Sequence, residues 1–258
     1  MTKHQQYISH YLAHRPLFFA LIRPQEAVFF DTNRTLLQQP ILDYGCGDGF
    51  FTEMVFGKKQ IDVGLDIVGS RAKQAEKQGI YKKIHYYDGG EIPFPSNHFG
   101  SIISNCVLEH IPQIDGALKE IYRVLKPGGY FLATVMTDRW EEYLLGAKIF
   151  GNYYRRTMRR KQDHYSLLSA KNWSSKFAKT GFKIKNHQGY ISRQNARYLD
   201  LFHYLSLPSL ITNVLFGKWV MWDFFSQNKV LNRLLVHLTK PPADSRQSAA
   251  LSFIFKKP

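Results

Sequence analysis

The sequence contains little cysteine. Cys46 and Cys106 are the only two cysteines in 258 residues, and neither belongs to a C-x-x-C pair. We therefore expect neither a disulfide framework nor a zinc site built on cysteines. Because this cysteine usage is typical of a reducing cytosol, we expect a cytoplasmic protein.

Long hydrophobic runs are absent from the N-terminal segment. The longest apolar run there, LFFALI at 17–22, lies between Arg15 and Arg23. It is too short for the core of a signal peptide or for a membrane span. We expect neither in this segment.

Acidic residues are scarce relative to basic ones. The chain has 20 Asp and Glu against 35 Lys and Arg, which gives a net charge of +15. This excess favours polyanionic surroundings such as nucleic acid, an anionic membrane face or a phosphorylated acceptor. Solubility alone is the simpler explanation. The hydrophobic fraction of 44% and the chain length suit one folded domain with a sizeable core.

The first half of the chain alternates strand-like and helix-like segments. The strand-like runs lie at 41–43, 61–67, 84–88, 101–105 and 130–135, and the helix-like segments lie at 50–56, 70–78 and 114–125. This alternation predicts a doubly wound α/β fold, in which helices cover both faces of a parallel sheet.

Polar side chains close four of these apolar runs, namely Asp43, Asp66, Asp88 and Asn105. In parallel sheets, ligands bind outside the carboxyl ends of the strands. The four residues therefore predict a ligand site at that edge, although ordinary strand caps would give the same pattern.

A glycine-rich run, DYGCGDG at 43–49, follows the first strand. Glycines at alternate positions let the backbone approach a ligand closely. The pattern is neither the G-x-G-x-x-G of dinucleotide sites nor the G-x-x-x-x-G-K of phosphate loops. A tight loop with no ligand is the alternative interpretation.

Several spaced motifs together resemble one family. They are LDYGCGDGFFT at 42–52, YDGGEIPFP at 87–95, VLEHIP at 107–112 and IYRVLKPGG at 121–129. Residues 40–135 are thus similar to the core of class I S-adenosylmethionine-dependent methyltransferases, especially the small-molecule and quinone-type branch. The resemblance implies a Rossmann-like, seven-stranded, mostly parallel sheet and S-adenosylmethionine as cofactor.

The resemblance also assigns residues to the methionine part of the cofactor. Asp43 would face its ammonium group, directly or through water. The backbone of Gly45, Cys46 and Gly47 would run beside it. Asn105 would line the pocket near the sulfonium.

The nucleoside part would be held by residues that follow the next two strands. Asp66 would accept hydrogen bonds from both ribose hydroxyls, which suits a carboxylate because it is an acceptor-only group. Asp88 would accept from the adenine amino group. Ile67 and Gly89 would lie near the adenine ring.

No catalytic residue is fixed by the sequence. His110 and His164 are weak candidates for a general base, and a structural histidine is the more common outcome for each. Some members of the family carry Glu-x-x-Glu-His and bind a divalent metal, but Cys106 replaces the first Glu here. We therefore expect no metal. Gly100 also replaces an Asp that is usual in this branch.

The second half supplies two further strands, at 182–191 and 251–256. In this family the seventh strand runs antiparallel between the fifth and the sixth. The connections 139–168 and 193–249 are long, which points to a functional lid. We expect helical insertions over the carboxyl-end face of the sheet.

We therefore expect a single class I methyltransferase domain over 1–258. Its parts would be an N-terminal helical cap at 1–39, a cofactor-binding core at 40–135, a basic helical insert at 139–168 and an aromatic, apolar helical insert at 193–249.

The basic insert contains YYRRTMRRK at 153–161, in which arginines recur four residues apart. A helix would place such pairs on one side. This suits an anionic membrane or a phosphate-bearing acceptor, with a solvated charged face as the alternative. The aromatic insert predicts an apolar acceptor pocket or a lipid interface, or else a helical subdomain with its own core.

The leading hypothesis is an S-adenosylmethionine-dependent methyltransferase that acts on an oxygen or carbon of a small, apolar or lipid-linked acceptor. An RNA methyltransferase is the second, because the positive charge could contact phosphates. No Asn/Asp-Pro-Pro-aromatic motif follows the fourth strand, however, and no RNA-binding module is recognisable. A cofactor-binding protein without transfer activity is the third.

Overall fold

The computed structural model describes residues 1–221 and 223–258, so Trp222 of the aromatic insert lies outside the described residues. The chain forms two compact units. The helical unit comprises Met1–Phe29, Thr137–Asp163 and Gly189–Leu251, and the sheet unit comprises Phe30–Met136, His164–Gln188 and Ser252–Pro258. Each is described by itself below.

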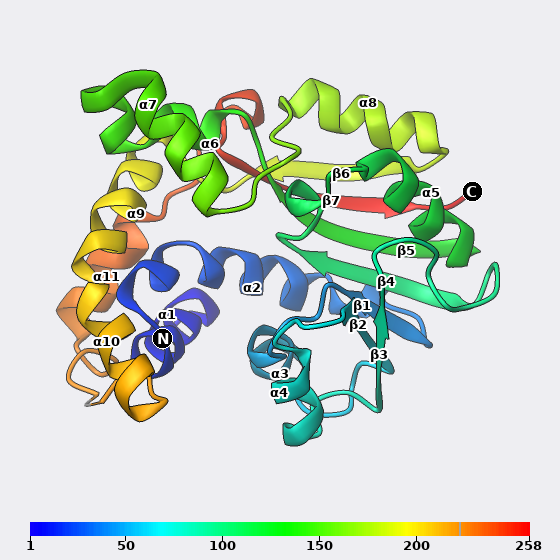
Figure 1. The fold of residues 1–258 in the computed structure, drawn as a ribbon, viewed down its shortest axis with the longest axis horizontal. Helices are drawn as coiled ribbons and strands as arrows, with labels where there is room; N and C mark the ends of the chain where they lie inside the picture. Colours follow the sequence, from blue (N-terminus) through cyan, green and yellow to red (C-terminus); the bar gives the residue numbers. More distant parts are fainter. Residues whose placement is uncertain (222) are drawn as a thin grey trace. The chain divides into compact units, whose positions relative to one another are not determined.

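A seven-stranded sheet in the order β3-β2-β1-β4-β5-β7-β6 organises the fold (Figure 1). Its strands are β1 (Ile41–Tyr44), β2 (Val63–Ile67), β3 (Lys83–Tyr87), β4 (Phe99–Asn105), β5 (Leu125–Met136), β6 (Lys183–Gly189) and β7 (Ala250–Lys256). The pairs from β3 to β5 are parallel.

The seventh strand runs opposite to its neighbour β5. Gly128 N donates to Lys257 O at 2.9 Å, and Lys257 N donates back to Gly129 O at 3.0 Å. Reciprocal bonds of this kind belong to antiparallel pairs. The predicted fold class, a mostly parallel seven-stranded sheet with an antiparallel seventh strand between the fifth and sixth, is therefore confirmed.

Helices of the sheet unit lie on both sides of the sheet (Figure 1). They are α3 (Phe50–Phe56), α4 (Ala72–Gln78), α5 (Ile114–Val124) and α8 (Ala170–Thr180), with short 3-10 turns η2 (Arg34–Leu36) and η3 (Leu108–His110). Sequence signals set their ends. Ser169 caps α8 by accepting from Asn172 N, and Gly79 ends α4 in a left-handed conformation.

Aromatic side chains fill the core between α8 and the sheet. The rings of Phe177 and Phe255 lie 4.1 Å apart between centroids, and that of Phe131 lies 5.4 Å from Phe255. All three are fully buried. Aromatic pairs at such distances add about 0.5–1.5 kcal/mol each beyond their buried area.

The fifth strand begins earlier than predicted. The sequence predicts a strand over 130–135, but β5 starts at Leu125 and runs through Pro127 and its two following glycines. The reason is a close backbone approach, since a Cβ on Gly129 would lie 2.7 Å from Gly100 O. A Cβ on Gly100 would lie 2.6 Å from Gln38 O, which explains the glycine that replaces the family's Asp.

The helical unit gathers the N-terminal segment and parts of both inserts. Its helices are α1 (Lys3–His14), α2 (Arg23–Thr32, which continues into the sheet unit), α6 (Arg139–Tyr143), α7 (Leu145–Lys161), α9 (Arg193–Leu205), α10 (Leu207–Phe216) and α11 (Lys229–Leu238), with 3-10 turns η1 (Leu17–Leu21) and η4 (Ser245–Gln247). The η4 turn lies in the connection between α11 and β7. Buried polar contacts join distant segments, as when Tyr190 OH donates to Glu26 Oε1 at 2.9 Å.

No single helix among residues 1–221 and 223–258 is long and apolar enough to cross a membrane. The pair formed by α9 and α10 meets the length and composition test when taken together, with a bend of 46° between the two helices.

Candidate cofactor-binding site

The predicted cofactor residues follow four neighbouring strands of the sheet unit. Asp43 lies in β1, with Gly45, Cys46 and Gly47 just after it; Asp66 and Ile67 end β2, Asp88 and Gly89 follow β3, and Asn105 ends β4. Because the strand order there is β3-β2-β1-β4, these residues share one edge of the sheet. This is the carboxyl edge, where ligands of such sheets bind.

The glycine loop after β1 adopts a conformation that favours glycine. Gly45 and Gly47 have φ of +79° and +53°. A Cβ on Gly45 would lie 2.4 Å from a methyl group of Val107, whereas a Cβ on Gly47 would meet no atom within 4 Å. The loop is therefore packed on one side at Gly45 and open beside Gly47, which leaves space for a ligand along its backbone.

Cys46 contributes its backbone to this loop. Its N–H donates to Leu65 O at 3.1 Å, as does that of Gly45 at 2.8 Å. The thiol is buried, and this burial raises its pKa. The cysteine is thus a neutral packing residue rather than a reactive thiolate.

Asp43 is buried behind the loop. Its Oδ2 accepts hydrogen bonds from Thr52 Oγ1 at 2.5 Å and from Tyr81 OH at 2.7 Å. Burial raises the pKa of Asp43 to about 6, although the two hydrogen bonds act in the opposite direction. These contacts connect β1 to α3 and to the segment before β3. The bond from Tyr81 was not predicted, because Tyr81 lies far from Asp43 in sequence. Thr52 belongs to the motif at 42–52, but the motif does not show which of its side chains pair.

Asp66 orients the glycine loop from the end of β2. Its Oδ2 accepts from Gly47 N at 2.7 Å, and its Oδ1 accepts from Ile67 N at 2.8 Å. A carboxylate has about four acceptor positions, so both oxygens can accept further donors. The side chain is only half-buried. It can therefore serve a diol while it holds the loop.

An exposed apolar side chain stands beside this carboxylate. Ile67 is 52% exposed, and a Cβ on Gly89 would lie 4.0 Å from its Cγ2. Asp88 is also exposed, and its Oδ1 accepts from Gly90 N at 2.9 Å. An apolar surface next to an acceptor suits a flat heteroaromatic ring that carries an amino group.

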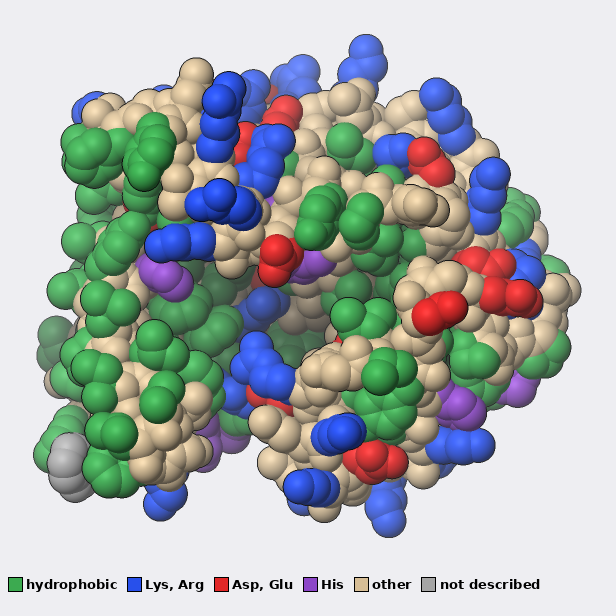
Figure 2. Space-filling view, in the orientation of Figure 1, with side chains coloured by type: hydrophobic (Ala, Val, Ile, Leu, Met, Phe, Trp, Pro, Cys, Tyr) green, Lys and Arg blue, Asp and Glu red, His purple; other side chains and the backbone are tan. Residues whose placement is uncertain are grey.

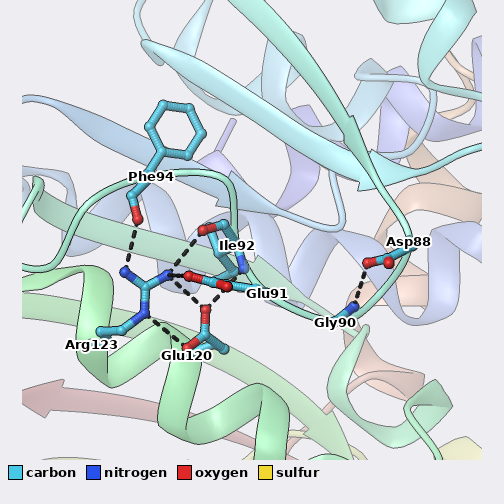
Figure 3. A network of polar contacts seen from close by, with 7 residues as sticks. All are labelled: Asp88, Gly90, Glu91, Ile92, Phe94, Glu120 and Arg123. Carbon is cyan, nitrogen blue, oxygen red and sulfur yellow. Dashed lines mark hydrogen bonds and ion pairs between the residues drawn. The ribbon is translucent and has the colours of Figure 1, made fainter.

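The loop that follows Asp88 is held by an arginine clamp (Figure 3). Arg123 donates to the carbonyls of Ile92 and Phe94 at 2.9 and 2.8 Å. It also donates to the carboxylate of Glu120, at 2.7 and 2.8 Å, and forms an ion pair with Glu91 at 3.8 Å. The clamp was not predicted, since the periodicity of α5 places Arg123 and Glu120 outside the apolar stripe, where solvent-exposed charges are expected.

Asn105 is fixed at the end of β4. Its Oδ1 accepts from Thr134 Oγ1 at 2.6 Å, and the N–H of the next residue, Cys106, donates to the same hydroxyl at 3.0 Å. Cys106 has a φ of +52°, which is uncommon for a residue other than glycine. A hydroxyl on β5 therefore holds the turn that leaves β4.

The two candidate bases lie close together. The His110 and His164 rings are 4.9 Å apart between centroids; His110 is exposed and His164 is buried. Glu109 lies beside them, buried, with Oε1 accepting from Met136 N at 3.2 Å. One potential ligand atom from each of the three residues lies within 4.8 Å of the others. These three residues could therefore hold a metal ion, and the expectation of no metal stays a prediction.

Comparison with known proteins gives the class of this domain. Residues 42–133 match the family model described as a methyltransferase domain. The chain is 35% identical over 117 residues to the sterol 24-C-methyltransferase of Pneumocystis carinii, which covers 40% of this chain and 30% of that protein. It is 34% identical over 103 residues to the ubiquinone/menaquinone biosynthesis C-methyltransferase UbiE of Vibrio cholerae, covering 36% and 40%. The matches thus span less than half of either relative.

Solved structures share the fold over most of the chain. An S-adenosylmethionine-dependent methyltransferase from Mesorhizobium loti superposes with a TM-score of 0.54 at 15% identity, covering 89% of this chain and 97% of that one. The [4+2]-cyclase SpnF gives 0.57 at 19% identity, covering 91% and 81%. The chain therefore carries a class I methyltransferase domain. The cofactor of a class I methyltransferase domain is S-adenosylmethionine.

The residues at the edge of the sheet suit this cofactor chemically. S-adenosylmethionine presents a diol, an adenine amino group and an ammonium group, all of which are hydrogen-bond donors. Asp66, Asp88 and Asn105 present acceptor oxygens at the carboxyl ends of β2, β3 and β4, and the backbone at Gly47 borders open space. The assignment of these residues to individual cofactor groups remains a prediction.

Proposed function

We propose that this chain transfers a methyl group from S-adenosylmethionine to an oxygen or a carbon of a small, apolar or lipid-linked acceptor. The match of residues 42–133 to a methyltransferase domain carries the proposal, because that range contains every predicted cofactor residue. Relatives named for sterols and for ubiquinone and menaquinone biosynthesis support an apolar acceptor.

When bound, the cofactor supplies an activated methyl group. The residues of the chain would hold and orient it. Asp66 keeps the glycine loop in place through Gly47, and Arg123 keeps the loop after Asp88 in place. Positioning of two reactants in this way can supply roughly 7–11 kcal/mol of the barrier reduction.

The acceptor must lose a proton if an oxygen is methylated. A base is needed only when that proton leaves during the attack. His110 is the better candidate, because it is the exposed member of the histidine pair. His164 is buried, so we propose that it positions the His110 ring.

We further propose that the protein is cytoplasmic and that its helical unit binds an anionic membrane surface, where the protein takes up its acceptor. Helix α10 has no buried residue. Its large apolar side chains are 49–75% exposed, namely Leu207, Leu210, Ile211, Val214, Leu215 and Phe216. Hydrophobic side chains gather where Figure 1 places α9 and α10 (Figure 2). Soluble monomers rarely expose such patches, whereas helices that lie in a lipid interface do.

A labelling experiment tests the transfer reaction. Purified protein, methyl-labelled S-adenosylmethionine and an extract of the host would be incubated and then partitioned into organic solvent. We expect the label in the organic phase. The variant Asp66→Ala should abolish labelling and weaken calorimetric cofactor binding by about tenfold or more, since a hydrogen bond to a charged group contributes about 1.5–3 kcal/mol.

Other outcomes identify the alternative functions. Label that stays in the aqueous phase and is released by nuclease would identify an RNA methyltransferase. Cofactor binding without any labelled product from the wild-type protein would identify a binding protein that does not transfer the methyl group.

A further inference from the structure

Four basic side chains converge on one cavity of the helical unit. The cavity has a volume of about 230 Å³, and Lys148, Arg155, Arg193 and Arg197 line it. Lys148 and Arg155 come from α7, while Arg193 and Arg197 lie one turn apart on α9. Residues four apart on a helix face the same way, so the two arginines of α9 act together.

The positive charge of this cavity is not balanced within the described residues. Glu142 is the one acidic residue of the lining, and it already pairs with Arg139 at 2.5 Å. Neither Lys148 nor any of the three arginines forms an ion pair with another described residue. The Nε of Arg155 is buried and has no hydrogen-bond partner. A buried guanidinium donor without a partner costs free energy, which a bound anion would recover.

The two helices that carry these side chains are held together by a buried acid. Asp200 of α9 accepts from Gly146 N at 2.8 Å and from Tyr154 OH at 2.5 Å, both of α7. A Cβ on Gly146 would lie 2.4 Å from the Tyr154 ring, so glycine is required for this approach. Arg193 is further oriented by the Tyr143 ring, with its guanidinium carbon 4.7 Å from the ring centroid. The cluster is therefore preorganised.

An apolar cavity adjoins the basic one. It has a volume of about 490 Å³ and shares Arg193 and Arg197 with its neighbour, while Leu145, Tyr198 and Leu201 form its apolar lining. Leu201 is partly exposed and belongs to the helix that leads to α10. A ligand that fills both cavities must have an anionic end and an apolar end.

We propose that the helical unit binds a phosphate group carried by an amphiphile. Arg155, Arg193 and Arg197, with Lys148, hold the phosphate, and the adjoining cavity takes the first part of the apolar chain. Three guanidinium groups suit a phosphate because each can donate two parallel bonds to it. The site would serve either to bind the acceptor or to attach the protein to a membrane, and this role rests on the proposed function above.

Calorimetry with soluble probes tests the site directly. The probes are dihexanoyl phosphatidic acid, dihexanoyl phosphatidylcholine and inorganic phosphate. We expect the phosphatidic acid to bind at least about tenfold more tightly than either of the others, because only it supplies both a dianion and apolar chains. Arg193→Gln/Arg197→Gln should weaken its binding by about tenfold or more, given the strength of hydrogen bonds to charged groups.

A matched variant controls for net charge. Arg156→Gln/Arg160→Gln removes the same charge from exposed positions of α7 that do not line either cavity. It should leave the affinity for phosphatidic acid within about twofold, because solvent screens distant charges. Equal losses in the two double variants would overturn the proposal, as would equal binding of inorganic phosphate. Displacement of the phosphatidic acid by an RNA oligonucleotide of equal affinity would do the same.

Two further measurements separate the source of the phosphate from the transfer reaction. Flotation with vesicles that contain phosphatidic acid, lost in Arg193→Gln/Arg197→Gln, would identify a membrane lipid. Binding of the soluble probe without flotation would identify a phosphate on the acceptor itself. If the wild-type protein binds the probe but yields no methylated product, the result would contradict the proposed transfer reaction and support the proposed phosphate site. S-adenosylmethionine binding should be unchanged in both double variants.

Discussion

At the scale of single residues, two glycines of the same loop have different roles. Gly45 packs against Val107, whereas Gly47 borders the space predicted for the cofactor. Gly45→Ala should destabilise the fold by about 1–3 kcal/mol, because it strains a residue with positive φ and drives a methyl group into Val107. Gly47→Ala should cost only about 1–2 kcal/mol for its backbone conformation. Gly47→Ala should weaken S-adenosylmethionine binding far more than Gly45→Ala does, since the added methyl group enters the open space predicted for the cofactor.

Chemical denaturation and cofactor calorimetry of both variants would check this contrast. Val107→Ala added to Gly45→Ala should recover part of the lost stability. Normal cofactor affinity in a folded Gly47→Ala protein would contradict the predicted position of the methionine part.

The buried carboxyl group of Asp43 predicts a dependence of stability on pH. Burial raises its pKa to about 6, above the value of an unfolded chain. The folded state therefore binds more protons between about pH 4 and pH 6, and the free energy of unfolding falls as pH rises through that range. A shift of this size corresponds to about 3 kcal/mol.

The variant Asp43→Asn isolates this effect, since it keeps an acceptor for Thr52 and Tyr81 but cannot ionise. Denaturation curves between pH 4 and pH 7 should show the variant gaining about 3 kcal/mol relative to the wild type as pH rises. Parallel pH profiles for the two proteins would mean that Asp43 titrates normally.

At the scale of the element, the arginine clamp on α5 predicts a local effect. Arg123→Lys keeps the charge but cannot bind the carbonyls of Ile92 and Phe94 and the Glu120 carboxylate at once. We expect amide hydrogen exchange at 88–94 to accelerate, with a stability loss of about 1–2 kcal/mol.

Cofactor affinity should fall in the same variant although Arg123 does not reach the site, because Asp88 begins the clamped loop. Lys119→Arg, a conservative change at an exposed position of α5 that takes no part in the clamp, serves as control. Unchanged exchange at 88–94 would show that the loop is held by other contacts.

The comparison of predicted and observed elements shows which signals are local. Strands that end in an acid and helices with a local stop, such as α4 before Gly79, were predicted within a few residues, because each signal lies inside its own segment. The start of β5 was misplaced, since it depends on the contact of Gly129 with Gly100. The hydrogen bond from Tyr81 to Asp43 was missed for the same reason.

At the scale of the whole molecule, the exposed apolar helix α10 predicts membrane association. Ile211→Asn/Leu215→Asn should reduce flotation with anionic vesicles several-fold while leaving the thermal unfolding midpoint nearly unchanged, because neither side chain is buried. Unaltered flotation, or a marked loss of stability, would show that α10 does not contact lipid. Vesicles of phosphatidylcholine alone test the contribution of charge.

The exposure of α10 could not be predicted from composition. An apolar stretch of this length usually packs in a core, and the sequence left a helical subdomain with its own core open. The structure places no residue of α10 in a core. The basic cavity could not be predicted either, since α8 and β6 separate Arg155 from Arg193 in the chain and the two residues meet only where α7 contacts α9.

The strand order also has a consequence for how the protein is made. Strand β7 follows both inserts in the chain, yet it lies between β5 and β6. During synthesis, β5 and β6 therefore leave the ribosome long before the strand that joins them, and each presents unpaired edge groups meanwhile. Such long-range pairing folds slowly and exposes intermediates to aggregation. Until β7 is made, the edge strand β6 therefore has no partner that connects it to the other five strands.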